Sequence, residues 1–376
     1  MGFTEGSGYD RSLVAGARAA VKDVLGLKKG ETIFIVTNPD RDVREISMAI
    51  FDEAAKAGAA PVLAFQDAKG QFDFTEETIV KAMHAEPDVL LSISADKLGK
   101  DKVGLLKGYK GKRKYNSIFE KLYEEKTSRA FWSPGVTKDM WRRTVPIDYT
   151  RLRSDCGRLM KHLNASASVR VTAPGGTDVT IGLKGRKSKP DDGDFRRPGS
   201  AGNVPSGEVY VSPELGTASG VIAFDGSIVL SEGEIVIRTP IVAEIANGFI
   251  TNLSGRSEAK ALRSSIAAGQ SKARKMASKG ELPKKDLESY LKNAAAIGEL
   301  GIGLNRRARI VANMLEDEKV YGTCHFAVGS NYDGDAESLI HLDGIVKRPT
   351  MTVMSSSGRE TVIMESGRLV WDQRKV

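Results

Sequence analysis

Residues 11–37 read RSLVAGARAAVKDVLGLKKGETIFIVT, a helical apolar pattern that passes through a turn into a short apolar run. The apolar residues on one face of this helix are Leu13, Ala17, Ala20, Val21 and Val24. Gly26 and Gly30 end the pattern, and the run at 32–37 has the length and β-branched content of a buried strand. The stretch therefore predicts a helix, a turn and a strand.

The same cycle continues through the first half of the chain. The expected elements are a helix over 43–57 that stops at Gly58, a strand over 61–65, a helix over 76–84 with Thr75 as its N-cap, a strand over 89–94, a helix over 118–126, a strand over 129–132, and a connection and helix over 141–163. Alternation of this kind predicts a parallel sheet covered by helices. We expect an N-terminal, Rossmann-like α/β scaffold domain over residues 1–160.

From Ser168 onward the pattern changes to short strand-like segments separated by Gly, Pro and Asp. The expected strands are 169–172, 178–183, 208–212, 220–224, 233–238, 249–253, 324–328 and 340–346, and the expected helices are 257–279 and 285–295. This pattern predicts a C-terminal α+β domain over residues 161–376 with a largely antiparallel sheet.

Length and composition agree with two globular domains. The chain has 376 residues, of which 40% are hydrophobic and 28% charged, and this excludes a disordered or fibrous protein. Two cysteines suggest a reducing compartment, and the first residues carry no basic and apolar leader. The longest stretch without charge, 320–332, is too short to span a bilayer. We expect a soluble, cytoplasmic protein.

The net charge of +8 gathers largely in residues 97–114, where eight Lys or Arg face one acid, Asp101. Nucleic-acid binding is one interpretation, but the run has a single aromatic residue, Tyr109, and no helical period for reading bases. A solvated loop or flap is favoured. The chain also lacks a phosphate-loop motif, and its glycines at 298, 301 and 303 do not have the spacing of a dinucleotide fingerprint.

Candidate chemistry lies in the second half, where the sequence at 338–344 is SLIHLDG. In a strand, His341 and Asp343 point to one face about 7 Å apart. Fifteen residues separate His341 from His325, which lies in another apolar, strand-like segment. Two His and one Asp suit a first-row divalent metal, although a histidine in an apolar strand is also a common core residue.

Two glutamates add to this group. Glu208 and Glu299 each stand in uncharged surroundings, where a carboxylate needs a partner. A metal is one such partner, and backbone N–H groups or a Lys or Arg side chain are the others. The residues alone leave these alternatives open.

These segments resemble the metal-dependent aminopeptidases typified by aminopeptidases T and S, particularly the shorter members described as leucyl aminopeptidases. The resemblance covers most of the chain and rests on segments 30–32, 176–178, 203–210, 299–305, 315–319, 322–329 and 341–343, taken in order. It implies an N-terminal α/β domain, a C-terminal catalytic domain and a homodimer.

The resemblance also implies site residues. The positions that match the family's five ligands to two divalent metals, zinc, cobalt or manganese, are Glu208, Glu299, His325, His341 and Asp343. Tyr332 matches the family's active-site tyrosine, Glu299 is a ligand or general base, and Glu318 is a base or an outer-sphere residue. Where the family often has two adjacent acids, this chain has Gly207 and Glu208. The gap between His325 and His341 is also shorter than in longer members.

Three functions follow from these observations. The first is an aminopeptidase in which a water held between two metals attacks peptides with a free N-terminus, with Tyr332 donating to the oxyanion. The second is a mononuclear Fe(II) ring-cleaving dioxygenase, since the dihydroxypyridine dioxygenases look like relatives of these aminopeptidases and His325, His341 and Asp343 would suffice for one iron. The third is a non-enzymatic binding protein that uses residues 97–114 for RNA or an acidic partner.

Overall fold

The computed structural model describes residues 8–70 and 73–372, and the chain divides into two compact units. The N-terminal unit comprises Met1–Arg153 and Asp191–Ser206, and the C-terminal unit comprises Ser154–Pro190 and Gly207–Val376. This division differs from the single boundary expected near residue 160. It falls within helix α7 (Tyr149–Asn164), and residues 191–206 return to the first unit because strand β10 (Ala201–Asn203) pairs with β6 (Arg129–Pro134).

The N-terminal unit contains the predicted parallel sheet. Its order is β10-β6-β3-β1-β2, with β1 at Thr32–Thr37, β2 at Ala60–Phe65 and β3 at Val89–Ser94, and every neighbouring pair is parallel. The description of this sheet as Rossmann-like stays a prediction. A mixed α/β fold is confirmed.

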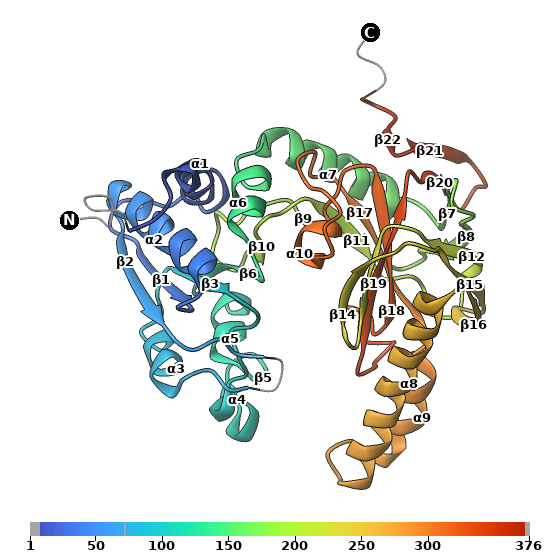
Figure 1. Cartoon of the computed structure of the whole chain (residues 1–376), viewed down its shortest axis with the longest axis horizontal. Coiled ribbons are helices and arrows are strands. Elements are labelled where there is room, and N and C mark those ends of the chain that lie inside the picture. Colours follow the sequence, from blue (N-terminus) through green and yellow to red (C-terminus); the bar gives the residue numbers. More distant parts are fainter. Residues whose placement is uncertain (1–7, 71–72, 373–376) are drawn as a thin grey trace. The chain divides into compact units, whose positions relative to one another are not determined.

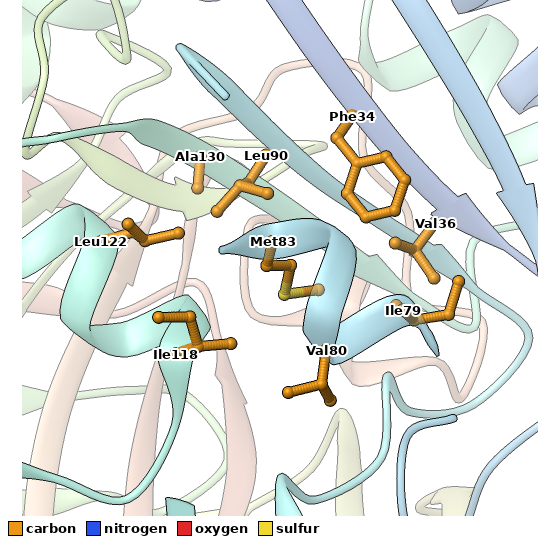
Figure 2. Packing of buried hydrophobic residues seen from close by; sticks show 9 residues of the cluster. All are labelled: Phe34, Val36, Ile79, Val80, Met83, Leu90, Ile118, Leu122 and Ala130. Atoms are coloured by element: carbon orange, nitrogen blue, oxygen red, sulfur yellow. The ribbon is translucent and has the colours of Figure 1, made fainter. Parts of the chain in front are cut away.

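Helices cover both faces of this sheet (Figure 1). They are the segments at 11–24, which contain α1 (Val14–Ala19), then α2 (Arg41–Lys56), α3 (Glu77–Met83), α5 (Ile118–Glu124) and α6 (Lys138–Thr144). Phe34 and Val36 point to the face that α3 and α5 cover, where they belong to one buried cluster with Met83 of α3 and Leu122 of α5 (Figure 2). Helix α2 packs against β1, β2 and β3.

One detail of the prediction is wrong. Thr75 does not cap α3, because Glu76 holds that position and the Thr75 hydroxyl donates instead to the Leu98 carbonyl oxygen at 3.0 Å. Residues 141–163, expected as a connection and a helix, comprise the end of α6, a connection that contains Pro146, and most of α7.

The basic run forms a short helix, α4 (Lys102–Lys107), and a two-stranded hairpin, β4 (Tyr109–Lys110) and β5 (Lys114–Tyr115). Arg113 at its turn bonds to Glu120 and Glu124 and lies 4.5 Å from the centre of the Tyr115 ring. Part of the basic charge is therefore neutralised within the unit.

The C-terminal unit contains two large sheets, which are largely antiparallel as predicted. The seven-stranded sheet has the order β14 (Gly233–Val236), β13 (Ser227–Leu230), β19 (His341–Lys347), β18 (Thr323–Gly329), β17 (Ile297–Gly303), β11 (Glu208–Val211), β9 (Lys189–Asp191). The eight-stranded sheet has the order β16 (Phe249–Ser254), β15 (Ile241–Ala246), β12 (Ser219–Phe224), β8 (Asp178–Gly182), β7 (Ser168–Thr172), β20 (Thr350–Met354), β21 (Glu360–Glu365), β22 (Arg368–Leu369).

The helices that accompany these sheets include α8 (Ser257–Ser278), α9 (Leu287–Asn293), the single turn α10 (Met314–Asp317) and the part of α7 that follows Arg153. Strand β17 was not predicted, because three of its seven residues are glycine, which has a low strand propensity. All seven of its residues are nevertheless buried. Within residues 8–70 and 73–372, no helix combines the length and the apolar character that crossing a membrane requires.

Candidate metal centre

Four adjacent strands of the seven-stranded sheet carry the five predicted ligands. Glu208 begins β11, Glu299 lies in β17 and His325 in β18, and β19 carries His341 and Asp343. The register pairs Ala327 with Asp343 and Gly301 with His325 across neighbouring strands. Residues separated by more than 130 positions in the sequence are thereby brought onto one region of a rigid sheet.

The two histidines face the carboxylates at short range. His325 Nε2 lies 3.2 Å from Glu299 Oε1 and 3.5 Å from Glu208 Oε2. His341 Nε2 lies 3.5 Å from Glu299 Oε2 and 3.3 Å from Asp343 Oδ1. Glu299 therefore turns one oxygen toward each imidazole, and all five predicted residues meet in one cluster.

Backbone features fix both rings. His341 Nδ1 lies 2.8 Å from the Ser330 carbonyl oxygen, which accepts its N–H and leaves Nε2 directed at the carboxylates. A Cβ atom at Gly301 would lie only 2.0 Å from His325 Nε2, so the His325 ring fills the space that a side chain at residue 301 would take. The glycine in β17 is thus required by the histidine in β18.

The charges of the cluster act on its titratable groups. Burial lowers the pKa of His325, but the hydrogen bond to Glu299 and the charges of Glu208, Glu299 and Asp343 outweigh it and raise that pKa to about 9. Burial likewise lowers the pKa of His341, and the Asp343 and Glu299 carboxylates reverse this and raise it to about 10. The cluster therefore favours positive charge at both imidazole rings.

A buried lysine, which the sequence did not reveal as part of the site, completes the cluster. The Lys319 side chain has 0% exposure, and its ammonium donates to Glu208 Oε1 at 2.8 Å and to Glu318 Oε1. Glu318 therefore lies at the cluster, next to the same ammonium as Glu208. In sequence, Lys319 ends the run Glu316-Asp317-Glu318-Lys319, which has the composition of a solvated surface.

The two acids before Glu318 build the turn that carries Lys319. Glu316 accepts the Arg309 backbone N–H at 2.7 Å, and Asp317 accepts those of Val311 and Ala312 at 2.8 and 3.0 Å. Burial raises the pKa of Asp317. These two carboxylates hold the loop at 309–313 against α10, and they do not belong to the ligand group.

Tyr332 lies at the edge of the cluster. Its ring centre is 5.2 Å from that of His341 and 5.4 Å from that of Tyr210, and 57% of the residue is exposed. Partial burial and the nearby carboxylates, Glu299 first among them, raise the pKa of its hydroxyl. Arg186 anchors the following segment through Asp333 at 3.2 Å and Asp335 at 2.5 Å. The ring therefore has a defined place beside the site.

The donor set fits a divalent metal. Among the residues that the structure describes, Glu299 Oε2 and Asp343 Oδ1 are buried without a hydrogen-bond partner. Oxygens in that position need a cation, and imidazole with carboxylate is a donor set suited to first-row metals. Ligand atoms of Glu208, Glu318 and His325 also lie within 4.8 Å of one another.

Comparison with protein families gives this cluster a context. The model of the family NicX: 2,5-dihydroxypyridine 5,6-dioxygenase matches residues 136–370, which is more than half of the chain and includes every residue of the cluster. The chain belongs to the NicX family. No curated protein matches it in sequence.

Two solved structures share the fold over nearly the full length. The 2,5-dihydroxypyridine dioxygenase of Pseudomonas putida KT2440 has a TM-score of 0.67 at 17% identity, over 95% of this chain and 96% of that chain. AmpT, an aminopeptidase T, of Thermus thermophilus has a TM-score of 0.66 at 18% identity, over 96% of this chain and 99% of that chain. At these identities the likeness establishes the fold that this NicX-family chain shares with both.

These findings refine the prediction. The resemblance to aminopeptidases T and S holds for the fold, whereas the family that matches is NicX. A metal-dependent enzyme is supported. The individual ligand roles, the homodimer and the peptide substrates stay predictions.

Proposed function

We propose that this chain is a mononuclear, iron-dependent dioxygenase that opens the ring of a hydroxylated nitrogen heteroaromatic compound. His325, His341 and Asp343 would hold the ferrous ion as two imidazoles and one carboxylate. When bound, iron supplies the one-electron chemistry that allows dioxygen to react with an aromatic ring. The dioxygenase activity for which the NicX family and the Pseudomonas putida protein are named supports this reaction class.

The position of Lys319 is the observation that supports a single metal ion. Glu208, which the two-metal ligand set would need, already shares a fully buried ammonium with Glu318. This internal cation compensates their charge, so Glu208 is held as an acceptor of Lys319 beside the iron ligands. Glu299 then orients both imidazoles from between them.

The chain's own aromatic residues provide a surface for a planar substrate. Tyr332 and Tyr210 meet edge to face, and Tyr332 also contacts the His341 ring. A flat ring placed against these side chains would lie next to the His341 imidazole. The Tyr332 hydroxyl, whose pKa is raised, stays protonated at neutral pH and can donate a hydrogen bond to an oxygen of the substrate.

A second candidate is a two-metal aminopeptidase, and one specific observation favours it. Glu299 directs one oxygen to each histidine, as a carboxylate that bridges two ions does. Glu208 Oε2 lies on the His325 side and Asp343 Oδ1 on the His341 side, so Glu208 and His325 would hold one ion and His341 and Asp343 the other, with Glu299 between them. The fold shared with AmpT supports this candidate as well.

Metal content and turnover separate the two candidates. Protein prepared without oxygen and loaded with ferrous iron is assayed for oxygen uptake on 2,5-dihydroxypyridine and on other hydroxypyridines, and its iron content per chain is measured. Protein loaded with zinc, cobalt or manganese is assayed for release of p-nitroaniline from aminoacyl anilides. His341→Ala is the control in both series.

One iron per chain with substrate-dependent oxygen uptake, lost in His341→Ala, would support the dioxygenase. Two ions per chain with aminoacyl-anilide hydrolysis and no oxygen uptake would replace it with the aminopeptidase. If neither activity depends on His341, both proposals fail.

A further inference from the structure

A cavity in the C-terminal unit shares no residue with the metal centre. It has a volume of about 440 Å³ and lies between the last turns of α7 and the hairpin of β20 and β21. Its lining residues are Arg158, Lys161, His162, Ala165, Ser166, Val353, Ser355, Arg359 and Thr361. A volume of this size holds a small molecule.

The charged groups of this cavity all have the same sign. Arg158 and Lys161 are three residues apart on α7 and so lie on one face of the helix, and Arg359 faces them from the hairpin. The lining contains no Asp or Glu. In the part of the chain that the structure describes, none of these three cations forms a salt bridge, although Arg158 lies 5.7 Å from the centre of the Trp371 ring.

Hydroxyl groups accompany the cations. Ser355, Ser166 and Thr361 line the cavity. The turn between β20 and β21 reads Ser355-Ser356-Ser357-Gly358-Arg359 and is closed by the Arg359 backbone N–H, which donates to Ser355 Oγ at 3.1 Å. Val353 provides a buried apolar floor. Cations placed beside hydroxyl groups form a set that recognises phosphate oxygens.

His162 supplies a neutral polar group at the same place. Its ring stacks on Trp371 with an interplanar angle of 11°. Burial and the neighbouring Lys161 charge lower its pKa, so the imidazole is mostly uncharged at pH 7 and can donate or accept a hydrogen bond. Because the two rings are stacked, we expect the fluorescence of Trp371 to respond to changes at His162.

We infer that this cavity is a binding site for a small phosphorylated anion. Arg158, Lys161 and Arg359 would pair with the phosphate oxygens, and Ser355 with its neighbouring hydroxyls would complete their hydrogen bonds. The site is independent of the proposed dioxygenase function, because its residues lie on α7, β20, β21 and the loops next to them, and none belongs to the metal cluster.

Calorimetric titration with sodium pyrophosphate tests this inference. The full chain is first freed of metal ions with a chelator and dialysed, because pyrophosphate itself binds divalent ions. The variants are Lys161→Gln and Arg359→Gln, which alter exposed side chains, and the matched control is Arg274→Gln on the exposed surface of α8. Trp371 fluorescence is followed in parallel, with Trp371→Phe as its control.

Pyrophosphate is expected to bind to one site per chain and to change the Trp371 signal. Each of Lys161→Gln and Arg359→Gln is expected to weaken binding about tenfold, as loss of one charge-assisted hydrogen bond does. Arg274→Gln should leave the affinity unchanged. Absence of binding, or equal weakening in Arg274→Gln, would overturn the inference, since the latter would indicate a diffuse charge effect.

Discussion

Replacing Lys319 by methionine should change the number of metals that the chain binds. Lys319 is fully buried and donates to Glu208 at 2.8 Å and to Glu318, whose side chains are only 8% and 17% exposed. Methionine keeps much of the side-chain volume and removes the ammonium. The two carboxylates would then lack their cation, and a second divalent ion can take its place.

The size of the effect on the free energy of unfolding follows from the burial of Lys319 and its two partners. Removing one partner of a buried ion pair costs about 3–5 kcal/mol, so the metal-free variant should lose this much free energy of unfolding. A site filled at 100 times its Kd stabilises the folded chain by about 2.7 kcal/mol. The wild type, with one ion, should gain about 2.7 kcal/mol from metal, and Lys319→Met, with two, about 5.4 kcal/mol.

Urea denaturation with and without metal gives these free energies, and metal analysis gives the number of ions per chain. Glu318→Gln is the matched control, because it keeps the contact between Lys319 and Glu208 and should bind one ion. Two ions in the wild type, or one ion in Lys319→Met, would refute the reasoning that Lys319 replaces a metal.

Three further predictions address the rest of the site and the scaffold. Gly301→Ala should lower metal affinity at least about tenfold while the circular dichroism spectrum is retained, because its Cβ would lie 2.0 Å from His325 Nε2; unchanged affinity would contradict this. Metal affinity should rise about 100-fold per pH unit between pH 6 and 8, because the metal displaces protons from His325 and His341, whose pKa values are about 9 and 10; competition titrations that show no slope would exclude it. Arg129→Met should reduce the free energy of unfolding by about 3–5 kcal/mol in urea titrations, since buried Arg129 bonds to Glu31 at 2.6 and 3.1 Å; a loss below about 1 kcal/mol would contradict it.

Elements with a strong local pattern could be predicted from the sequence. The strands at 32–37 and 89–94 were predicted with their observed bounds, because each is an apolar run flanked by polar residues and turns. Strand β17 could not be predicted from the sequence, because its three glycines hide the alternation of apolar and polar side chains that marks a strand. They are needed for close packing, since a Cβ at Gly303 would lie 2.1 Å from the Val320 carbonyl oxygen.

The same contrast holds within the site. The alternation at His341 and Asp343 placed both side chains on one face, and the structure agrees. Lys319 was missed because its partner Glu208 lies 111 positions away, and only the folded sheet brings them together. The sequence of an acidic run that contains a lysine looks the same whether that lysine is solvated or buried.

The return of residues 191–206 to the N-terminal unit has a consequence for how the chain folds during synthesis. Strand β10 is the edge strand beside β6, so the first sheet is complete only after about 200 residues have left the ribosome. By then α7 and strands β7–β9 have also emerged. A fragment that ends after residue 160 would expose the polar backbone of β6 as an open edge, prone to pairing with other chains. The two units therefore cannot be separated by a single cut in the gene, and an isolated N-terminal unit has to be built by joining residues 1–153 to residues 191–206.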